Sequence, residues 1–162
     1  MSNTFNYAFI DSQNLHRGIK SLGWEVDYRK FRLYLTNKFD VTKAFIFIGY
    51  VPTNQTLYTM LQKAGFIVVF KPTVTYRDCG QEIVKGNVDA ELVLHSAAIE
   101  YQNYDKAVIV TNDGDFACLL KYLKEKNKLE KVLAPHSRYS KLFKPYTGFI
   151  LTLDKLQDQL EL

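Results

Sequence analysis

Residues 107–116 read AVIVTNDGDF, an apolar run followed at once by an Asp-Gly-Asp segment. The apolar half, Ala107–Thr111, is predicted to be a buried strand. A second apolar run, Tyr7–Ile10, ends in the same way at Asp11. Open α/β sheets place their ligand sites outside the carboxyl ends of their strands. Two strands that end in acidic residues therefore predict one acidic pocket at one edge of a sheet.

The rest of the chain alternates short apolar runs with amphipathic stretches. Strands separated by helices of about a dozen residues imply βαβ units, and hence a mainly parallel sheet with helices on both faces. The sequence predicts an α/β fold in a single domain over residues 1–162. The predicted strands are Tyr7–Ile10, Ala44–Tyr50, Phe66–Phe70, Ala107–Thr111, Glu130–Ala134 and Phe149–Leu153. The predicted helices are Asp27–Phe39, Asn54–Ala64, Val88–Tyr101, Phe116–Lys126 and Asp154–Leu162.

Residues 71–87 interrupt this alternation with mixed polar, glycine and basic content. Connections of this length are often functional or mobile. We therefore expect this segment to be a loop beside the site.

Composition narrows the class of protein. A hydrophobic share of 47% is that of an ordinary globular chain, which argues against disorder. The net charge of +4 is compatible with a polyanionic partner without demanding one. Cys79 and Cys118 stand apart without a CxxC spacing, which disfavours a zinc finger or a disulfide scaffold. No signal peptide is evident, and no apolar run approaches the roughly 20 residues of a membrane span. The expected location is cytoplasmic, without a membrane.

Four acidic residues follow or begin these predicted elements: Asp11, Asp89, Asp113 and Asp115. Each of them alone could cap or begin a helix, because carboxylates accept hydrogen bonds from the first backbone amides and interact well with the helix dipole. Capping does not explain why two separate strands both end in carboxylates. Clustered carboxylates repel one another, so a stable cluster usually implies a hard divalent cation.

The chemistry that suits such a cluster is metal-assisted hydrolysis of a phosphodiester. Magnesium or manganese ions held by carboxylates orient and activate a water, and they stabilise charge on the phosphate. Zinc or iron would call for more His or Cys. Asn14 could hold a carboxylate or a metal-bound water by hydrogen bonds, and Thr111 is placed for similar support.

Three segments resemble the signature motifs of NYN domains, in order and in spacing: Asp11–Leu15, Lys85–Asp89 and Thr111–Phe116. NYN domains are a branch of the PIN-like ribonuclease superfamily and include the LabA-like bacterial proteins. The resemblance spans roughly residues 5–155. It implies a Rossmann-like (PIN-like) three-layer α/β/α fold and an Mg²⁺- or Mn²⁺-dependent endoribonuclease site. By that resemblance the catalytic residues would be Asp11, Asn14, Asp89, Asp113 and Asp115, with the four aspartates as metal ligands and a small hydroxyl residue at Thr111.

One position departs from the pattern of the family. Many members carry another acidic residue two turns into the helix that begins near Asp89, where this chain has His95. A neutral histidine lowers the negative charge of the site, although it could bind metal or hydrogen-bond substrate. A packed or surface histidine is the alternative. Some PIN-like domains have also lost cleavage activity.

Basic residues gather in one part of the chain. Eight Lys or Arg residues lie between Lys121 and Lys144, interleaved with aromatic residues. They could contact phosphates while the rings stack on unpaired bases, or they could form a solvated helix face and a basic loop. The loop after the Glu130–Ala134 strand should open beside the aspartates. The predicted RNA-binding residues are therefore His136, Arg138 and Lys141 in that loop, with Arg77 and Lys85 from the opposite side and Arg17 and Lys20 as further phosphate contacts.

The leading hypothesis is a metal-dependent endoribonuclease acting on single-stranded or structured RNA. The alternative is a catalytically weak or inactive PIN-like module that binds RNA or a protein. A nuclease held by a cognate protein partner, a DNA nuclease and a homo-oligomer also stay open. A Rossmann cofactor enzyme is disfavoured, because no GxGxxG follows the first strand.

Overall fold

A six-stranded parallel sheet forms the centre of the molecule, in the order β3-β2-β1-β6-β7-β8. The structure is a computed structural model that describes residues 4–85 and 87–162, and the side chains of Val84 and Lys85 lie outside this description. The parallel central sheet confirms the α/β fold that the sequence predicts. The strands are β1 (Asn6–Asp11), β2 (Val41–Tyr50), β3 (Phe66–Pro72), β6 (Ala107–Val110), β7 (Leu129–Ala134) and β8 (Ile150–Thr152).

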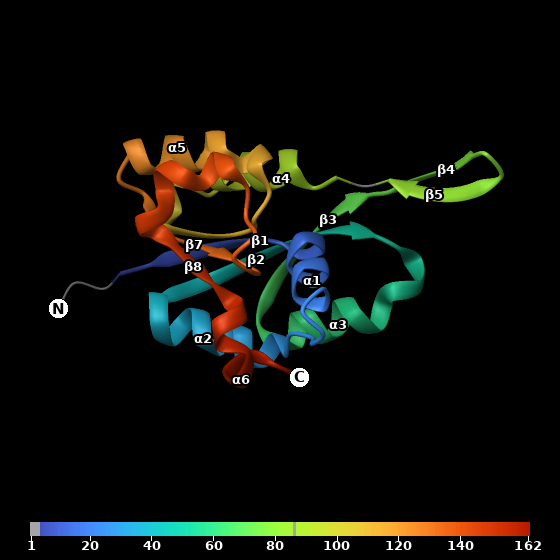
Figure 1. The fold of residues 1–162 in the computed structure, drawn as a ribbon, viewed down its shortest axis with the longest axis horizontal. Coiled ribbons are helices and arrows are strands. Elements are labelled where there is room, and N and C mark those ends of the chain that lie inside the picture. The colour runs from blue at the N-terminus through green and yellow to red at the C-terminus, as the bar shows by residue number, and fades with distance from the viewer. Residues whose placement is uncertain (1–3, 86) are drawn as a thin grey trace.

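Helices cover both faces of the sheet, so the molecule has three layers (Figure 1). On one face lie α4 and α5, and on the other lie α1, α2, α3 and α6. The bounds are α1 (Ser12–Lys20), α2 (Tyr28–Phe39), α3 (Gln55–Ala64), α4 (Asp89–Leu94), α5 (Ala117–Glu125) and α6 (Gln157–Leu160).

Alternate residues of each central strand supply the two cores. In β1, Phe9 packs with the apolar side chains of α4 and α5, whereas Ile10 packs with those of α1, α2 and α3. Both side chains are fully buried. Because the central strands are covered on both faces, they appear in the sequence as continuous apolar runs, which made them predictable.

The segment 71–87 differs from the expected loop. It contains a two-stranded antiparallel hairpin, β4 (Val74–Asp78) and β5 (Gln81–Lys85), which projects from the end of β3 (Figure 1). The two residues between the strands, Cys79 and Gly80, both have positive φ, the backbone that a type I′ hairpin turn requires. The hairpin escaped prediction because β4 is exposed along its whole length and so lacks the apolar pattern of a core strand.

Two helical segments also differ from expectation. Helix α1 was not predicted, because only Leu15 and Ile19 give its nine residues an apolar face. The predicted helix Val88–Tyr101 is helical but not uniform, since α4 continues as a π-helical turn over His95–Ile99. Within the described parts of the chain, we find no helix with the length and apolar character needed to span a membrane.

Candidate metal site

The acidic residues lie where the strand order of the sheet reverses. From β1 the chain builds β2 and β3 on one side, and then crosses to β6, β7 and β8 on the other. Strands β1 and β6 pair in parallel, with Ile10 opposite Val110. Asp11 and Thr111 are therefore the next residues along each strand. Ligands of open α/β sheets bind at such a switch point, outside the carboxyl ends of the strands.

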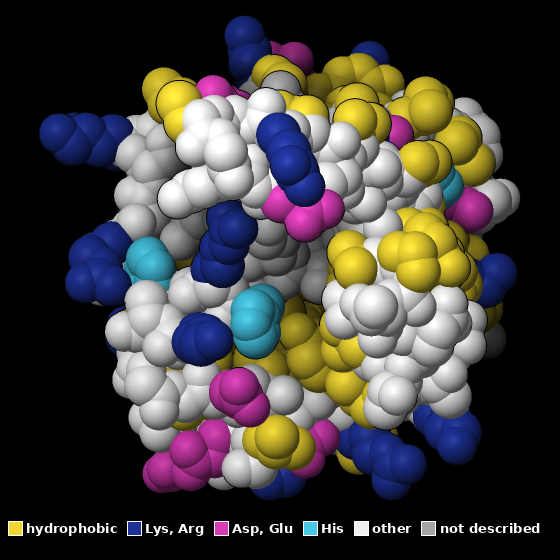
Figure 2. Space-filling model, turned by 90° about the vertical axis from the view of Figure 1, so that its right-hand side faces the viewer, with side chains coloured by type: hydrophobic (Ala, Val, Ile, Leu, Met, Phe, Trp, Pro, Cys, Tyr) yellow, Lys and Arg dark blue, Asp and Glu magenta, His cyan; other side chains and the backbone are white. Residues whose placement is uncertain are grey.

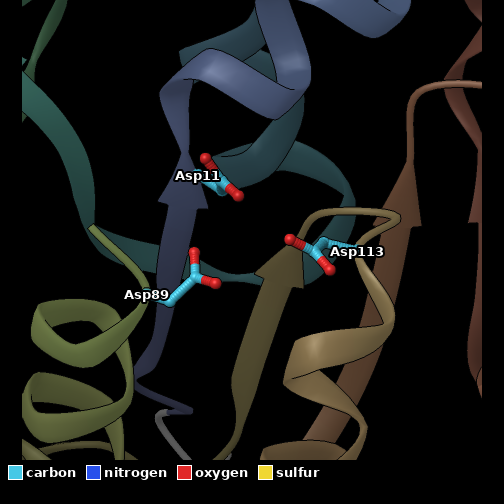
Figure 3. Close-up of side chains that lie close together, drawn as sticks. All are labelled: Asp11, Asp89 and Asp113. Carbon is cyan, nitrogen blue, oxygen red and sulfur yellow. The ribbon is translucent and has the colours of Figure 1, made fainter. Parts of the chain in front are cut away.

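Three carboxylates meet at this point: Asp11 at the end of β1, Asp89 at the start of α4, and Asp113 in the turn after β6 (Figure 3). One oxygen from each lies within 4.8 Å of the others. Asp11 is 5% exposed, and the other two are partly buried. The arrangement is consistent with a metal site built from oxygen ligands alone.

Two of these carboxylates also cap helical turns. Oδ1 of Asp11 accepts a hydrogen bond from the backbone N–H of Asn14, at 3.3 Å, where α1 begins. Oδ1 of Asp113 accepts one from the backbone N–H of Asp115, at 2.9 Å. Asp89 differs, because its own backbone N–H donates to Asn87 Oδ1, at 2.8 Å. Capping and metal binding are therefore compatible, since a cap uses one oxygen of each carboxylate.

The side chains of Asn14 and Thr111 join the segments that carry the carboxylates. Asn14 Nδ2 donates to Asn112 Oδ1 at 2.6 Å, and the backbone N–H of Asn112 donates back to Asn14 Oδ1 at 2.9 Å. The Thr111 hydroxyl accepts from the backbone N–H of Asp113 at 3.2 Å and donates to Asp11 Oδ2 at 3.5 Å. Asn112 lies within the third motif, but its role was not predicted because its partner Asn14 is 98 residues away in the chain.

The electrostatics of the cluster favour a cation. Burial, the largest cause, and the charges of Asp89 and Asp113 together raise the pKa of Asp11 to about 6, although hydrogen bonds from the Asn14 amide and the Thr111 hydroxyl act to lower it. Burial is also the largest cause that raises the pKa of Asp89, followed by the charge of Asp113. A divalent cation would relieve both the repulsion and the cost of burying charge.

Asp115 and His95 lie outside the three-carboxylate cluster. Asp115 is exposed, and its negative charge contributes to the raised pKa of Asp89. His95 packs on Phe47 of β2, with ring centroids 5.2 Å apart, and its Nδ1 lies 2.8 Å from the carbonyl oxygen of Glu91. Its ring thus contacts the sheet instead of contributing to the cluster.

The cluster forms one wall of a hollow of about 670 Å³. Three basic side chains line it as well: Arg17 from α1, and His136 and Arg138 from the loop after β7. Figure 2 views the molecule from the side on which the strands end, and Lys, Arg and His side chains lie around the hollow in this face. The hollow therefore combines carboxylates that could hold a metal cation with basic side chains that could bind an anionic group.

Close backbone contacts hold the basic loop against the cluster. A Cβ on Gly18 of α1 would lie 2.5 Å from Pro135 Cβ, and a Cβ on Gly114 would collide with the Ser140 side chain. The backbone N–H of Ser140 also donates to the carbonyl of Asn112, at 3.2 Å. Glycine is thus needed at both positions for close approach.

The other predicted RNA-binding residues are placed elsewhere. Arg77 is exposed on β4 of the projecting hairpin, and Lys141 is exposed at the start of the 3₁₀ segment Lys141–Phe149. Neither of them lines the hollow. Lys85 ends β5, and its side chain lies outside the described residues.

A parallel α/β sheet with an acidic cluster at its switch point defines the general class of this protein. The particular family follows from comparison: the chain matches the NYN domain over residues 7–152 and belongs to that family, a branch of the PIN-like nucleases. Its fold is similar to that of a protein of unknown function from Vibrio parahaemolyticus, with a TM-score of 0.79, 22% identity, and coverage of 98% of this chain and 96% of that one. No curated protein matches the chain.

Proposed function

We propose that this protein is a metal-dependent endoribonuclease that hydrolyses RNA phosphodiester bonds at the acidic cluster. The observation that carries the proposal is the approach of three carboxylate oxygens to within 4.8 Å of one another at the switch point of the sheet. Membership of the NYN family supports the nuclease, and the basic residues around the hollow suit a polyanionic substrate.

The donor atoms fit a hard divalent cation. Asp11, Asp89 and Asp113 would hold it, and their oxygens are the ligands that Mg²⁺ and Mn²⁺ prefer. Such a cation, when bound, stabilises charge that develops on a phosphate and promotes the attack of water.

The residues around the cluster would position it and the substrate. The hydrogen bonds between Asn14 and Asn112 hold the start of α1 against the turn that carries Asp113. Arg17 and Arg138, which line the hollow together with the carboxylates, would contact phosphates of the strand. Contacts of this kind position a strand without reading its sequence.

Cleavage of matched RNA and DNA oligonucleotides, with Mn²⁺ and with a chelator, tests the proposal. We expect Mn²⁺-dependent cleavage of RNA that Asp113→Asn reduces at least about 100-fold, the effect typical of losing a group that stabilises charge in the transition state. Asp158→Asn on the exposed surface of α6 is the matched control and should cleave normally. Equal cleavage by Asp113→Asn and wild type would refute the assignment. Salt-sensitive RNA binding without any cleavage would favour the alternative, a binding module.

A further inference from the structure

A second hollow adjoins the acidic one. It has a volume of about 940 Å³ and lies beside the carboxyl end of β2, between α1 and α3. Three residues line both hollows: Gln13 and Arg17 on α1, and Val88 before α4. The two hollows therefore share a border at these three residues.

The lining of the second hollow is mainly apolar. Its walls include Phe47 and Ile48 from β2 and Leu57 from α3. Polar and charged side chains also line it, among them those of His16, Glu25, Asp27, Arg29 and Asn54. Figure 2 shows hydrophobic side chains inside the depression of this face, next to a histidine. Mainly apolar walls that also carry polar groups are typical of sites for small organic ligands.

We propose that the second hollow binds an unpaired nucleobase of the strand whose phosphate lies at the acidic cluster. The inference rests on the proposed function in one respect, namely that a nucleic acid binds at that cluster. Arg17 borders both hollows, so its guanidinium can contact the phosphate that links a base in one to the backbone in the other. The hollow lies within the range of about 300–1,000 Å³ that small-ligand sites occupy.

This placement selects the substrate class. A base inside a duplex cannot enter a side pocket unless its pair opens, which costs a few kcal/mol. A base in a single strand or a loop enters without that cost. The preferred substrate is therefore a strand or loop with unpaired bases, and a continuous duplex should bind more weakly.

A coupling experiment tests where the base lies. The affinity of the protein for a labelled single-stranded RNA is compared with its affinity for a set of strands of the same sequence. Each strand of the set lacks the base at one position, and the position differs from strand to strand. All proteins carry Asp113→Asn, so that binding is measured without cleavage. Asn54→Trp narrows the hollow from its exposed rim, and Leu57→Ala enlarges it. Thr53→Trp is the matched control, because Thr53 is exposed next to Asn54 and does not line the hollow.

We expect one position at which removal of the base weakens binding about tenfold, within the range reported for loss of one base contact. Asn54→Trp and Leu57→Ala should change the affinity for the complete strand. They should have little effect on the affinity for the strand that lacks that base. When two groups are in contact, the free-energy effects of removing each one do not add. Thr53→Trp should preserve the difference between the two strands.

Two outcomes would overturn the inference. In the first, base removal and each of the two substitutions change the affinity for RNA independently, so that their free-energy effects add. In the second, the protein does not bind RNA. Thermal unfolding of each variant shows whether it is folded before its affinity is interpreted. The proposed function is assessed separately, by Mn²⁺-dependent cleavage with Asp113 intact. Cleavage without coupling would refute only the proposed base subsite. Coupling without cleavage would refute the nuclease activity but would support the base subsite.

Discussion

Asn14 and Asn112 are joined by a reciprocal pair of hydrogen bonds, although they lie 98 residues apart in the sequence. One bond connects the two side chains, and the other connects the Asn112 backbone N–H to the Asn14 side chain. Asn14 lies three residues after Asp11, and Asn112 directly precedes Asp113. The pair therefore sets the separation of two carboxylates that come from different parts of the chain.

Removal of this pair should loosen the site. We expect Asn14→Ala to lower the free energy of unfolding by about 1–3 kcal/mol, because the partly buried Asn112 N–H loses its acceptor. Urea denaturation measures the change. Asn103→Ala removes an exposed asparagine that bonds Glu100 and should change stability by less than about 0.5 kcal/mol. Similar losses in the two variants would contradict the role given to Asn14.

Binding of a divalent cation should stabilise the fold. A ligand present at 100 times its dissociation constant adds about 2.7 kcal/mol to the free energy of unfolding. Thermal unfolding should therefore shift upward with added Mn²⁺ in the wild type and shift much less in Asp89→Asn. Asp158→Asn should respond like the wild type. If Asp89→Asn keeps the full shift, Mn²⁺ binds elsewhere.

The metal-free protein should lose stability as the pH rises from about 4 to above 6. The pKa of Asp11 is about 6 in the fold and 3.8 ordinarily, so the folded state binds more protons in this range. A shift of this size corresponds to roughly 3 kcal/mol at neutral pH. Asp11→Asn should reduce the decline and stabilise the metal-free protein at pH 7, while abolishing its response to Mn²⁺. Urea denaturation across the pH range with a chelator present measures this, and an unchanged decline in Asp11→Asn would contradict it.

Gly18→Ala should destabilise the protein although it raises the helix propensity of α1. The new methyl group would lie 2.5 Å from Pro135 Cβ, which is too close for any real contact. Overpacking of this kind costs about 1–3 kcal/mol, more than the roughly 1 kcal/mol that alanine gains over glycine within a helix. Gly148→Ala is the matched control, because a Cβ there meets no atom within 4 Å. Stability of Gly18→Ala equal to that control would show that the basic loop is not held by this contact.

The basic side chains of the acidic hollow should set the salt dependence of RNA binding. If Arg138 contacts one phosphate, Arg138→Gln should make the slope of log affinity against log salt shallower by about 0.7, the value for one contact to a single strand. Lys155→Gln, on an exposed part of the chain outside the hollow, should leave the slope unchanged. Fluorescence anisotropy at several salt concentrations measures both. Equal slopes for Arg138→Gln and wild type would remove Arg138 from the phosphate contacts.

Elements with a distinct local sequence pattern were the most predictable. The predicted strand Ala44–Tyr50 lies within β2, and Phe66–Phe70 lies within β3. Strands buried on both faces are continuous apolar runs, so their positions can be inferred without a tertiary structure. Helix α1 and the β4–β5 hairpin were missed because α1 has few apolar residues and the hairpin is exposed.

The candidate site also has a part that was predictable from local sequence and a part that was not. Its acidic residues were named from their places at strand ends and helix starts. One acidic pocket at the edge of the sheet was predicted as well, but not which of the four aspartates form it: Asp11, Asp89 and Asp113 come together, whereas Asp115 lies outside the cluster. The roles of Asn112, Gly18 and Gly114 were also missed, because each depends on a contact with a segment distant in sequence.

The sequence by itself determined the parallel α/β fold, the family and the residues that end each central strand. These properties follow from local patterns, because short apolar runs rich in β-branched and aromatic residues favour buried strands and each motif is contiguous in the chain. Only the tertiary structure decided which carboxylates meet, which basic side chains line the hollow beside them and that an apolar hollow adjoins it. Those relationships depend on the order of the strands in the sheet and on contacts between segments that are distant in sequence. Neither can be inferred from a local sequence pattern.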